Sequence, residues 1–243
     1  MLISVQGILL KTIKHSDSSA IVHVFSRQQG RRAYFLRGIS KKKNSPRALL
    51  YPLAIQELQV IEKENKSLGQ VKELGLAYPS PELISNPMKS SVALFLTEIL
   101  EKSIVENYQN EVLFDFLENS IKLLDAATEV ANFHIWFLIR LSKHFGFYPS
   151  SPAKTHGGSN LFFNLEDGSF LSSRPILESY AEPPIAMHII HFLGMNFDAM
   201  STYKLKTEER AELLRTMVSY FKIHVPNLNH IASLDVLETV FEF

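Results

Sequence analysis

The chain has 243 residues, of which 46% are hydrophobic, and its formal charge at pH 7 is zero. This length can hold one large domain or two ordinary ones, and the apolar content supports a buried core, which argues against wholesale disorder. The absence of cysteine excludes disulfides, thiolate zinc sites and a cysteine nucleophile.

The first third of the chain has the pattern of antiparallel strands. Residues 1–78 contain short runs of β-branched and aromatic residues separated by turn residues, and such runs are typical of strands. We expect strands over residues 4–13, 20–26, 31–37, 53–61 and 68–78. Five short strands in this length predict a small closed barrel, for which the five-stranded OB-fold is the leading nucleic-acid-binding candidate.

The rest of the chain has the pattern of helices. Tyr78-Pro79-Ser80-Pro81 marks the boundary, and beyond it the apolar residues recur with a period of 3.6. We expect helices from residues 86 and 110, over residues 129–145, 184–193 and 207–224, and a short last one from residue 233. A hairpin is expected where residues 161–164 face residues 169–171 across Asp167-Gly168.

These elements define the expected architecture. The fold class is α+β with two domains, a five-stranded OB-fold β-barrel followed by an all-α helical domain with a small hairpin insertion. The predicted bounds are residues 1–80 for the barrel and 81–243 for the helical domain. No uncharged apolar window is long enough to span a membrane, and the N-terminus lacks the positive flank of a signal peptide. We therefore expect a soluble, cytoplasmic protein.

The charges of the two parts are opposed. Residues 1–80 hold 13 Lys and Arg against 5 Asp and Glu, a balance of +8, and residues 81–243 hold 12 against 20, or −8. The excess gathers in residues 27–47, which we call the basic stretch and which contain eight cations and no acidic residue. A solvated strand edge that deters aggregation needs fewer cations, so we favour a surface for an anionic polymer.

Phosphates require charge, and unpaired bases require flat rings for stacking. Tyr34 and Phe35 could supply a ring, but strand alternation sends them to opposite faces, so at most one is a platform and the other belongs to the core. The candidate DNA-binding residues are Arg27, Arg31, Arg32, Tyr34, Arg37, Lys41, Lys42, Lys43 and Arg47.

The sequence contains none of the common catalytic patterns. It has no G-x-S-x-G, P-loop, G-x-G-x-x-G or H-E-x-x-H motif. His15, Asp17 and Ser18 are better explained as one turn than as a triad, whose members converge from separate elements. His188 and His191 have a spacing that can hold a metal, but no cysteine or suitably spaced carboxylate accompanies them, so packing or surface roles are favoured. We expect no enzyme, no metal and no cofactor.

The acidic helical part is a less suitable DNA surface, and its amphipathic helices could bind a peptide instead. The candidate partner site combines cations with apolar residues on the third main helix: Phe137, Arg140, Leu141 and Lys143. Ordinary exposed cations on an amphipathic helix remain the simpler interpretation of this group.

An ordered set of short motifs resembles the bacterial RecO family of recombination mediators over nearly the full length. In the first part the motifs are Gly7-Ile8-Leu9, Asp17-Ser18-Ser19, Ile21-Val22, Phe25-Ser26, Gly30, Gly38, the basic loop and Pro52. Further on they are Thr97-Glu98-Ile99-Leu100, Phe145-Gly146-Phe147-Tyr148-Pro149, His224-Val225-Pro226 and Ser233-Leu234-Asp235-Val236-Leu237.

The resemblance implies an N-terminal OB-fold and a helical C-terminal domain. It also implies binding of single- and double-stranded DNA, strand annealing, and help in loading the RecA recombinase onto strands coated by single-stranded DNA-binding protein (SSB). The implied partners are RecR, RecF, RecA and the acidic, Phe-ended SSB tail, in a nucleoid-associated setting. Many relatives carry a four-cysteine zinc module after the position of Pro149, whereas this chain has no cysteine, so we expect a metal-free hairpin there.

Two other functions remain open. In one, the protein is an adaptor whose basic stretch meets an acidic protein, and DNA affinity is incidental. In the other, the barrel binds RNA, as some OB-folds do.

Overall fold

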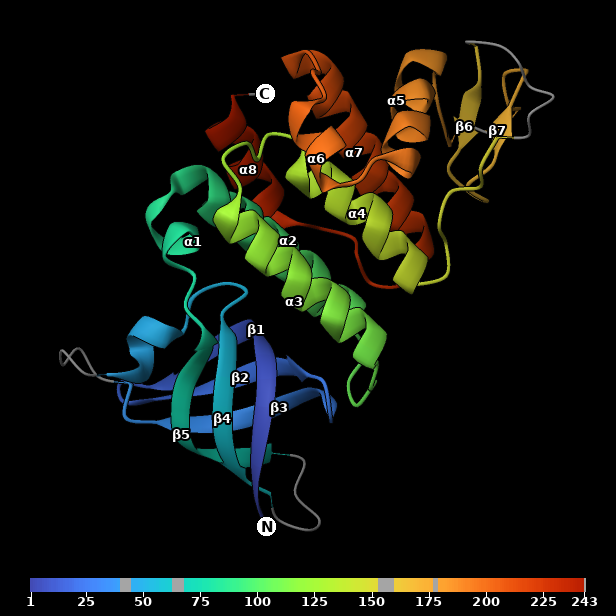
Figure 1. The fold of residues 1–243 in the computed structure, drawn as a ribbon. Helices are drawn as coiled ribbons and strands as arrows, with labels where there is room; N and C mark the ends of the chain where they lie inside the picture. Colours follow the sequence, from blue (N-terminus) through green and yellow to red (C-terminus); the bar gives the residue numbers. More distant parts are fainter. Residues whose placement is uncertain (40–44, 63–67, 153–159, 177–178, 243) are drawn as a thin grey trace. The chain divides into compact units, whose positions relative to one another are not determined.

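The computed structural model describes residues 1–39, 45–62, 68–152, 160–176 and 179–242. Its chain divides into two compact units, Met1–Ala127 and Thr128–Phe243. The first unit holds a barrel and three helices, and the second holds the remaining helices and a small sheet (Figure 1).

Five strands close into a barrel in the first unit. They are β1 (Leu2–Ser16), β2 (Ser19–Ser26), β3 (Gly30–Arg37), β4 (Ile55–Ile61) and β5 (Leu68–Tyr78). Their order around the barrel is β1-β2-β3-β5-β4, and β3 and β5 pair in parallel whereas the other pairs are antiparallel. This order is that of a five-stranded OB-like barrel, so the predicted fold of the first part is confirmed.

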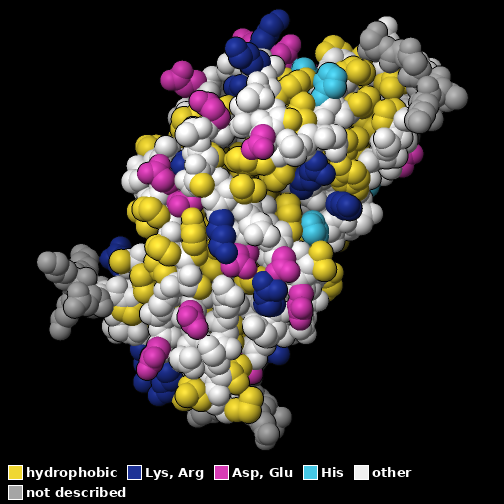
Figure 2. All heavy atoms as spheres, in the orientation of Figure 1, with side chains coloured by type: hydrophobic (Ala, Val, Ile, Leu, Met, Phe, Trp, Pro, Cys, Tyr) yellow, Lys and Arg dark blue, Asp and Glu magenta, His cyan; other side chains and the backbone are white. Residues whose placement is uncertain are grey.

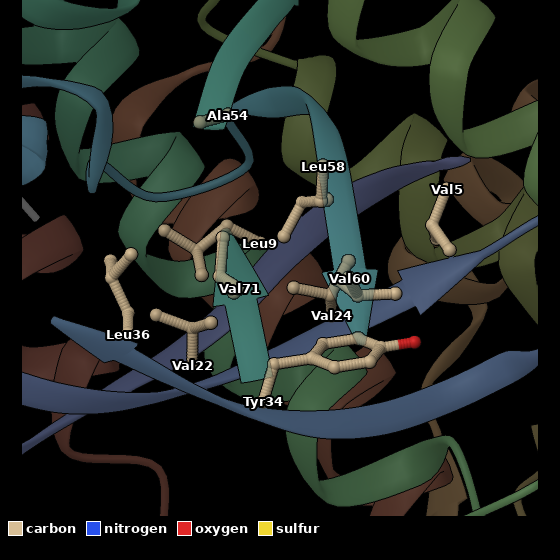
Figure 3. Close-up of a cluster of buried hydrophobic side chains, with 10 residues drawn as sticks. All are labelled: Val5, Leu9, Val22, Val24, Tyr34, Leu36, Ala54, Leu58, Val60 and Val71. Atoms are coloured by element: carbon tan, nitrogen blue, oxygen red, sulfur yellow. The ribbon is translucent and has the colours of Figure 1, made fainter. Parts of the chain in front are cut away.

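Alternate side chains of the strands fill the barrel, as the two-residue period of a strand requires. The core residues are Val5, Leu9, Val22, Val24, Tyr34, Leu36, Ala54, Leu58, Val60 and Val71 (Figure 3). Full burial of one large apolar side chain is worth about 1.5–3 kcal/mol, so this set supplies most of the drive for closure. Beyond the core, residues 11–18 at the end of the β1–β2 hairpin are all exposed.

Three helices complete the first unit: α1 (Pro81–Ser85), α2 (Pro87–Ser103) and α3 (Glu111–Ala126). Asn86 caps α2 as its position before Pro87 predicts, since its side chain accepts hydrogen bonds from the backbone N–H groups of Met88 and Lys89. The α2 helix packs against β1. The change from strands to helices therefore falls near residue 80 as expected, while the compact unit continues to Ala127; the domain bounds of 1–80 and 81–243 stay a prediction.

The second unit is mainly helical. Its helices are α4 (Phe133–His144), α5 (Pro183–Gly194), α6 (Phe197–Thr202), α7 (Thr207–His224) and α8 (Ala232–Phe241). The predicted hairpin forms as β6 (Phe162–Asn164) and β7 (Phe170–Leu171), and β8 (Tyr180–Ala181) pairs with the other edge of β6. None of the described helices is long and apolar enough to cross a membrane.

Tyr220 on α7 joins the hairpin to the end of α4. Its hydroxyl donates to the carbonyl of Phe147 at 2.6 Å, and burial raises the pKa of this hydroxyl to about 12. Gly168 in the hairpin turn has a φ of +71°, and a Cβ there would lie 2.4 Å from the Tyr220 hydroxyl. The hairpin turn therefore needs glycine both for its backbone conformation and for the close approach of the tyrosine.

Candidate nucleic-acid interface

The first half of the basic stretch binds the helices of its own unit. Arg31 donates to the carbonyls of Glu101 and Ile104, the latter at 2.7 Å, and its guanidinium lies 3.1 Å from the Glu101 carboxylate. These carbonyls end α2, where a cation offsets the negative end of the helix dipole. Only 12% of the Arg31 side chain is exposed, so Arg31 holds α2 against the barrel.

Arg27 holds α3 in a similar way. Its guanidinium pairs with Asp115 and lies 3.4 Å from Glu118, and it stands 5.0 Å from the centre of the Phe114 ring. Glu118 lies four residues after Phe114 and three residues after Asp115, so it is a neighbour of both on the surface of α3. This side of α3 therefore presents both carboxylates and the ring to Arg27. The acidic partners that the basic stretch lacks are thus supplied by α2 and α3.

Gly30 and His23 also lie in the region where α2 and α3 cover the barrel. A Cβ on Gly30, whose φ is +66°, would lie 2.2 Å from the carbonyl oxygen of Tyr108, so the β2–β3 turn abuts the loop that follows α2. Burial, and then the charge of Arg31, lowers the pKa of His23 on β2. Covered segment is our name for residues 27–31, whose arginines are engaged by α2 and α3.

The later part of the basic stretch contains two exposed arginines, Arg37 and Arg47. Register pairs Phe35 with Ile21 and Arg37 with Ser19, so both residues lie on the outer face of β3. The Arg37 guanidinium lies 5.6 Å from the centre of the Phe35 ring, and the ring of His15 meets Phe35 edge-on at 5.3 Å. Exposed segment is our name for the described residues among 35–47 other than Leu36, which belongs to the barrel core.

Arg47 is the second exposed arginine of this segment, in the 3-10 helix η1 (Pro46–Leu49). It lines a hollow of about 760 Å³ together with Lys14 from the β1–β2 hairpin. The other described residues around the hollow are Thr12, Ser16, Asp17, Ala20, Ile39 and Leu50. The hollow has hydroxyls and two cations beside an apolar wall, although Lys14 pairs with Asp17 at 2.8 Å. Arg47 is therefore the cation best placed to contact a phosphate with an attached sugar or base.

The predicted DNA-binding residues therefore fall into distinct places. Arg27 and Arg31 are engaged by helices, Arg37 and Arg47 are exposed, and Arg32 is half-buried on the opposite side of β3 from Arg31. Among the described residues, neither Arg37 nor Arg47 forms an ion pair. Lys41, Lys42 and Lys43 lie outside the described residues.

Tyr34 requires a correction. Its side chain is 1% exposed and lies among the core valines and leucines (Figure 3), while its hydroxyl donates to Gln29 at 2.7 Å. Burial raises the pKa of this hydroxyl. The prediction that Tyr34 stacks on bases is wrong for this structure, because Tyr34 is the core member of the pair and Phe35 is the outward one.

Sequence reasoning missed the hairpin side chains that join this surface. His15, Lys14 and Ile13 belong to the exposed end of the β1–β2 hairpin, and Ile13 is 42% exposed. Neither hydropathy nor local charge distinguishes these residues from an ordinary turn. Only the pairing of β1 with β2 and of β2 with β3 brings His15 next to Phe35.

The candidate partner site on α4 is only partly on the surface. Phe137 and Leu141 are buried, with 1% and 0% exposure, so the prediction that they receive a partner directly is corrected. Arg140 donates to the carbonyl of Met195, and Lys143 is exposed. The helix turns its apolar residues into the core and leaves Lys143 as the accessible cation.

Cations and anions are interspersed on one face of the molecule. On the face shown in Figure 2, Lys and Arg side chains are scattered among Asp and Glu side chains rather than gathered in one patch. Nearby opposite charges weaken the attraction of a paired cation for a distant anion. Arg37 and Arg47, which pair with no carboxylate of the described residues, therefore stand out as candidate phosphate contacts.

Comparisons with known proteins agree with this two-part architecture. The family model for the N-terminal part of recombination protein O matches residues 1–79, and the one for its C-terminal part matches residues 85–231. The chain is similar to proteins named DNA repair protein RecO. The one from Bacteroides fragilis is 34% identical over all of both chains. The one from Phocaeicola vulgatus is 32% identical, as is that from Flavobacterium psychrophilum, each match covering 99% of this chain and 100% of the relative. The chain belongs to the RecO family.

Proposed function

We propose that the protein binds DNA in recombinational repair through the exposed segment of its barrel. The observation that carries this proposal is the pair of exposed arginines, Arg37 and Arg47, which form no ion pair among the described residues. Their place on an OB-like barrel supports it, because the face around strands 2 and 3 and the adjoining loops are where such barrels bind oligonucleotides. The relatives, which are named DNA repair proteins, supply the repair context.

The proposed action needs no covalent chemistry. Phosphate contacts hold a strand by its backbone and reduce its charge, so that two complementary strands approach and pair. Bases must stay free to pair, which suits a surface with few ring contacts and several cations. We therefore propose that the protein is not an enzyme, acts on single- and double-stranded DNA and anneals complementary strands.

The proposed partners follow the family resemblance. They are RecR, RecF and RecA, and the acidic C-terminal tail of SSB, with the protein helping to load RecA onto SSB-coated strands in the cytoplasm. In this chain Lys143 is the member of the α4 site that a soluble acidic tail can reach directly, because Phe137 and Leu141 are buried. Replacing Lys143 with Glu should weaken binding of an acidic, Phe-ended peptide without changing DNA affinity.

Strand annealing tests the proposal. The variant that combines Arg37→Glu and Arg47→Glu should anneal two complementary labelled strands at least about tenfold more slowly, since two cations become two anions at the proposed contact. Lys72→Glu is the matched control, because Lys72 is an exposed cation of β5 outside the basic stretch. Equal annealing by the wild type and the double variant, with both folded by circular dichroism, would overturn the proposed site.

The adaptor function is distinguished by competition. If the basic stretch binds an acidic protein, an acidic peptide and single-stranded DNA should compete strongly for the protein. Separate sites predict that saturating peptide changes the DNA affinity by less than about twofold. Fluorescence anisotropy of a labelled strand, measured with and without the peptide, decides between these functions, and an RNA strand of the same length tests the remaining alternative.

A further inference from the structure

Three side chains of the second unit converge on one point. The Nδ1 atoms of His188 and His191 each lie 2.9 Å from the hydroxyl oxygen of Tyr203. The histidines are three residues apart on α5 and so share one side of that helix. Tyr203 is the C-cap residue that directly follows α6. Both histidine rings meet the tyrosine ring edge-on, at centroid distances of 6.0 and 5.8 Å.

The hydrogen bonds of this cluster require an unequal arrangement of protons. A phenol has one proton and donates to one acceptor only, so the hydroxyl donates to one histidine and must accept from the N–H of the other. The two imidazoles then adopt opposite tautomers around the same oxygen. This arrangement gives each of the three side chains a hydrogen-bond partner. It also places two nitrogen atoms and one oxygen atom, which can serve as metal ligands, within reach of one cation.

We propose that His188, His191 and Tyr203 form a binding site for a divalent transition metal, with water as a fourth ligand. Imidazole nitrogens select zinc, copper or nickel over magnesium and calcium, which prefer oxygen ligands. Metal–ligand bonds of about 2.0–2.1 Å in tetrahedral geometry place neighbouring donors about 3.3 Å apart. Each histidine nitrogen therefore needs to move only about 0.4 Å farther from the Tyr203 oxygen than its hydrogen-bonded position at 2.9 Å, which side-chain rotation can supply.

Access and surroundings are compatible with this site. His191 is exposed, so an ion reaches the cluster without opening the core. Binding through the phenolate oxygen would release the phenol proton to solvent.

The third ligand explains why the spacing of the histidines did not identify the site. The described residues contain no group of three or more His, Cys, Asp or Glu that could hold a metal, and the histidine pair alone lacks a third donor. Tyr203 lies 12 residues after His191, and α6 returns it to α5. A bound ion would link α5 to the segment between α6 and α7.

Metal titration of the full-length protein tests the site. We expect Zn²⁺ to bind with one equivalent in calorimetry, and Cu²⁺ to produce a visible phenolate-to-copper charge-transfer band. His191→Gln should weaken binding at least about tenfold. Tyr203→Phe keeps the ring and removes only the oxygen, so it should abolish the band and weaken Zn²⁺ binding. His15→Gln, which removes a histidine from the first unit, should bind like the wild type.

The outcomes separate a metal site from a purely structural hydrogen-bond cluster. If the wild type and the variant combining His188→Gln with His191→Gln bind Zn²⁺ equally, or if the charge-transfer band persists in Tyr203→Phe, the proposal is overturned. Far-UV circular dichroism of each variant guards against unfolding. The melting temperature gives an independent readout, because an ion that binds only the folded state should raise it in the wild type and in His15→Gln but not in the double variant.

Discussion

The covered and exposed segments of the basic stretch each contain two arginines, and those arginines have different roles. Arg31 in the covered segment is 12% exposed and bound to the last carbonyls of α2, whereas Arg37, only six residues later, is exposed and has a ring of its own strand as its recorded neighbour. Strand geometry alone places both arginines on the outer face of β3. The difference comes from what covers that face, which is α2 and α3 at one end and solvent at the other.

The number of cations in a sequence run therefore does not give the number that are available to bind a ligand. Glu101, Asp115 and Glu118 engage two of the eight cations, although they lie some 70 to 90 residues away in the sequence. A partly buried arginine with a carboxylate partner contributes to stability, and an exposed arginine contributes mainly to long-range attraction. We therefore expect substitutions in the covered segment to lower the free energy of unfolding, and substitutions in the exposed segment to weaken DNA binding.

Breaking the covered segment should have the largest effect. Arg31→Met leaves the last carbonyls of α2 without their arginine donor and leaves the Glu101 carboxylate with Lys11 alone. We therefore expect the free energy of unfolding to fall by about 3 kcal/mol. Denaturant unfolding measures this change. Lys14→Met is the control, because Lys14 pairs with Asp17 in an exposed ion pair and its loss should cost less than about 1 kcal/mol. Equal effects of the two changes would contradict the assigned roles.

Gly30 in the covered segment and Gly38 in the exposed segment allow the same comparison of stability. Gly30→Ala should destabilise the protein by about 2–3 kcal/mol, because it adds strain at positive φ and a collision with the carbonyl of Tyr108. Gly38 also has positive φ, +81°, but no atom of the described residues lies within 4 Å of its Cβ position. Gly38→Ala should therefore cost only the strain, about 1 kcal/mol. A larger loss at Gly38 than at Gly30 in thermal unfolding would argue against the packing of the β2–β3 turn on the α2–α3 loop.

Much of this architecture was predictable from the sequence. The five strands follow from runs of alternating β-branched residues, and the cap at Asn86 follows from its place before Pro87. The short elements α1, α6 and β8 were not predicted, because two to six residues carry too little periodicity. The candidate site was predictable as a charged segment only. Which arginines are engaged depends on contacts between β3 and α2 or α3, and no local pattern encodes such contacts.

The ring on the exposed segment should give a smaller, non-ionic effect. Phe35→Ala should weaken single-stranded DNA binding by about 1–2 kcal/mol if a base stacks there, with no change in salt dependence because no charge is altered. Duplex affinity should change little, since paired bases are not free to stack. Anisotropy titrations of a single strand and its duplex measure both quantities. An equal loss on the two substrates would show that Phe35 supports the fold of the surface instead of stacking.

Stability should also depend on pH through His23, which lies on β2 beside the covered segment. Burial lowers the pKa of His23 in the folded protein, so the unfolded chain binds its proton more readily, and stability falls as pH drops below about 6.5. One such histidine costs at most about 1.4 kcal/mol at one pH unit below its unfolded value. His23→Gln should reduce the stability difference between pH 7.5 and 5.5. Buried His134, whose pKa is lowered to about 3, gives the wild type and the His23→Gln variant the same pH dependence. Its contribution therefore cancels when the two proteins are compared.

The most direct test of the division of roles is the salt dependence of single-stranded DNA binding. If four phosphates are engaged, the slope of log affinity against log salt should be about −3, from about 0.7 per phosphate. The variant with Arg37→Glu and Arg47→Glu should lose about 1.4 or more of that slope at unchanged melting temperature, while Lys72→Glu keeps the wild-type value. A double variant with the wild-type slope and affinity would contradict the account and place the DNA contacts outside the exposed segment.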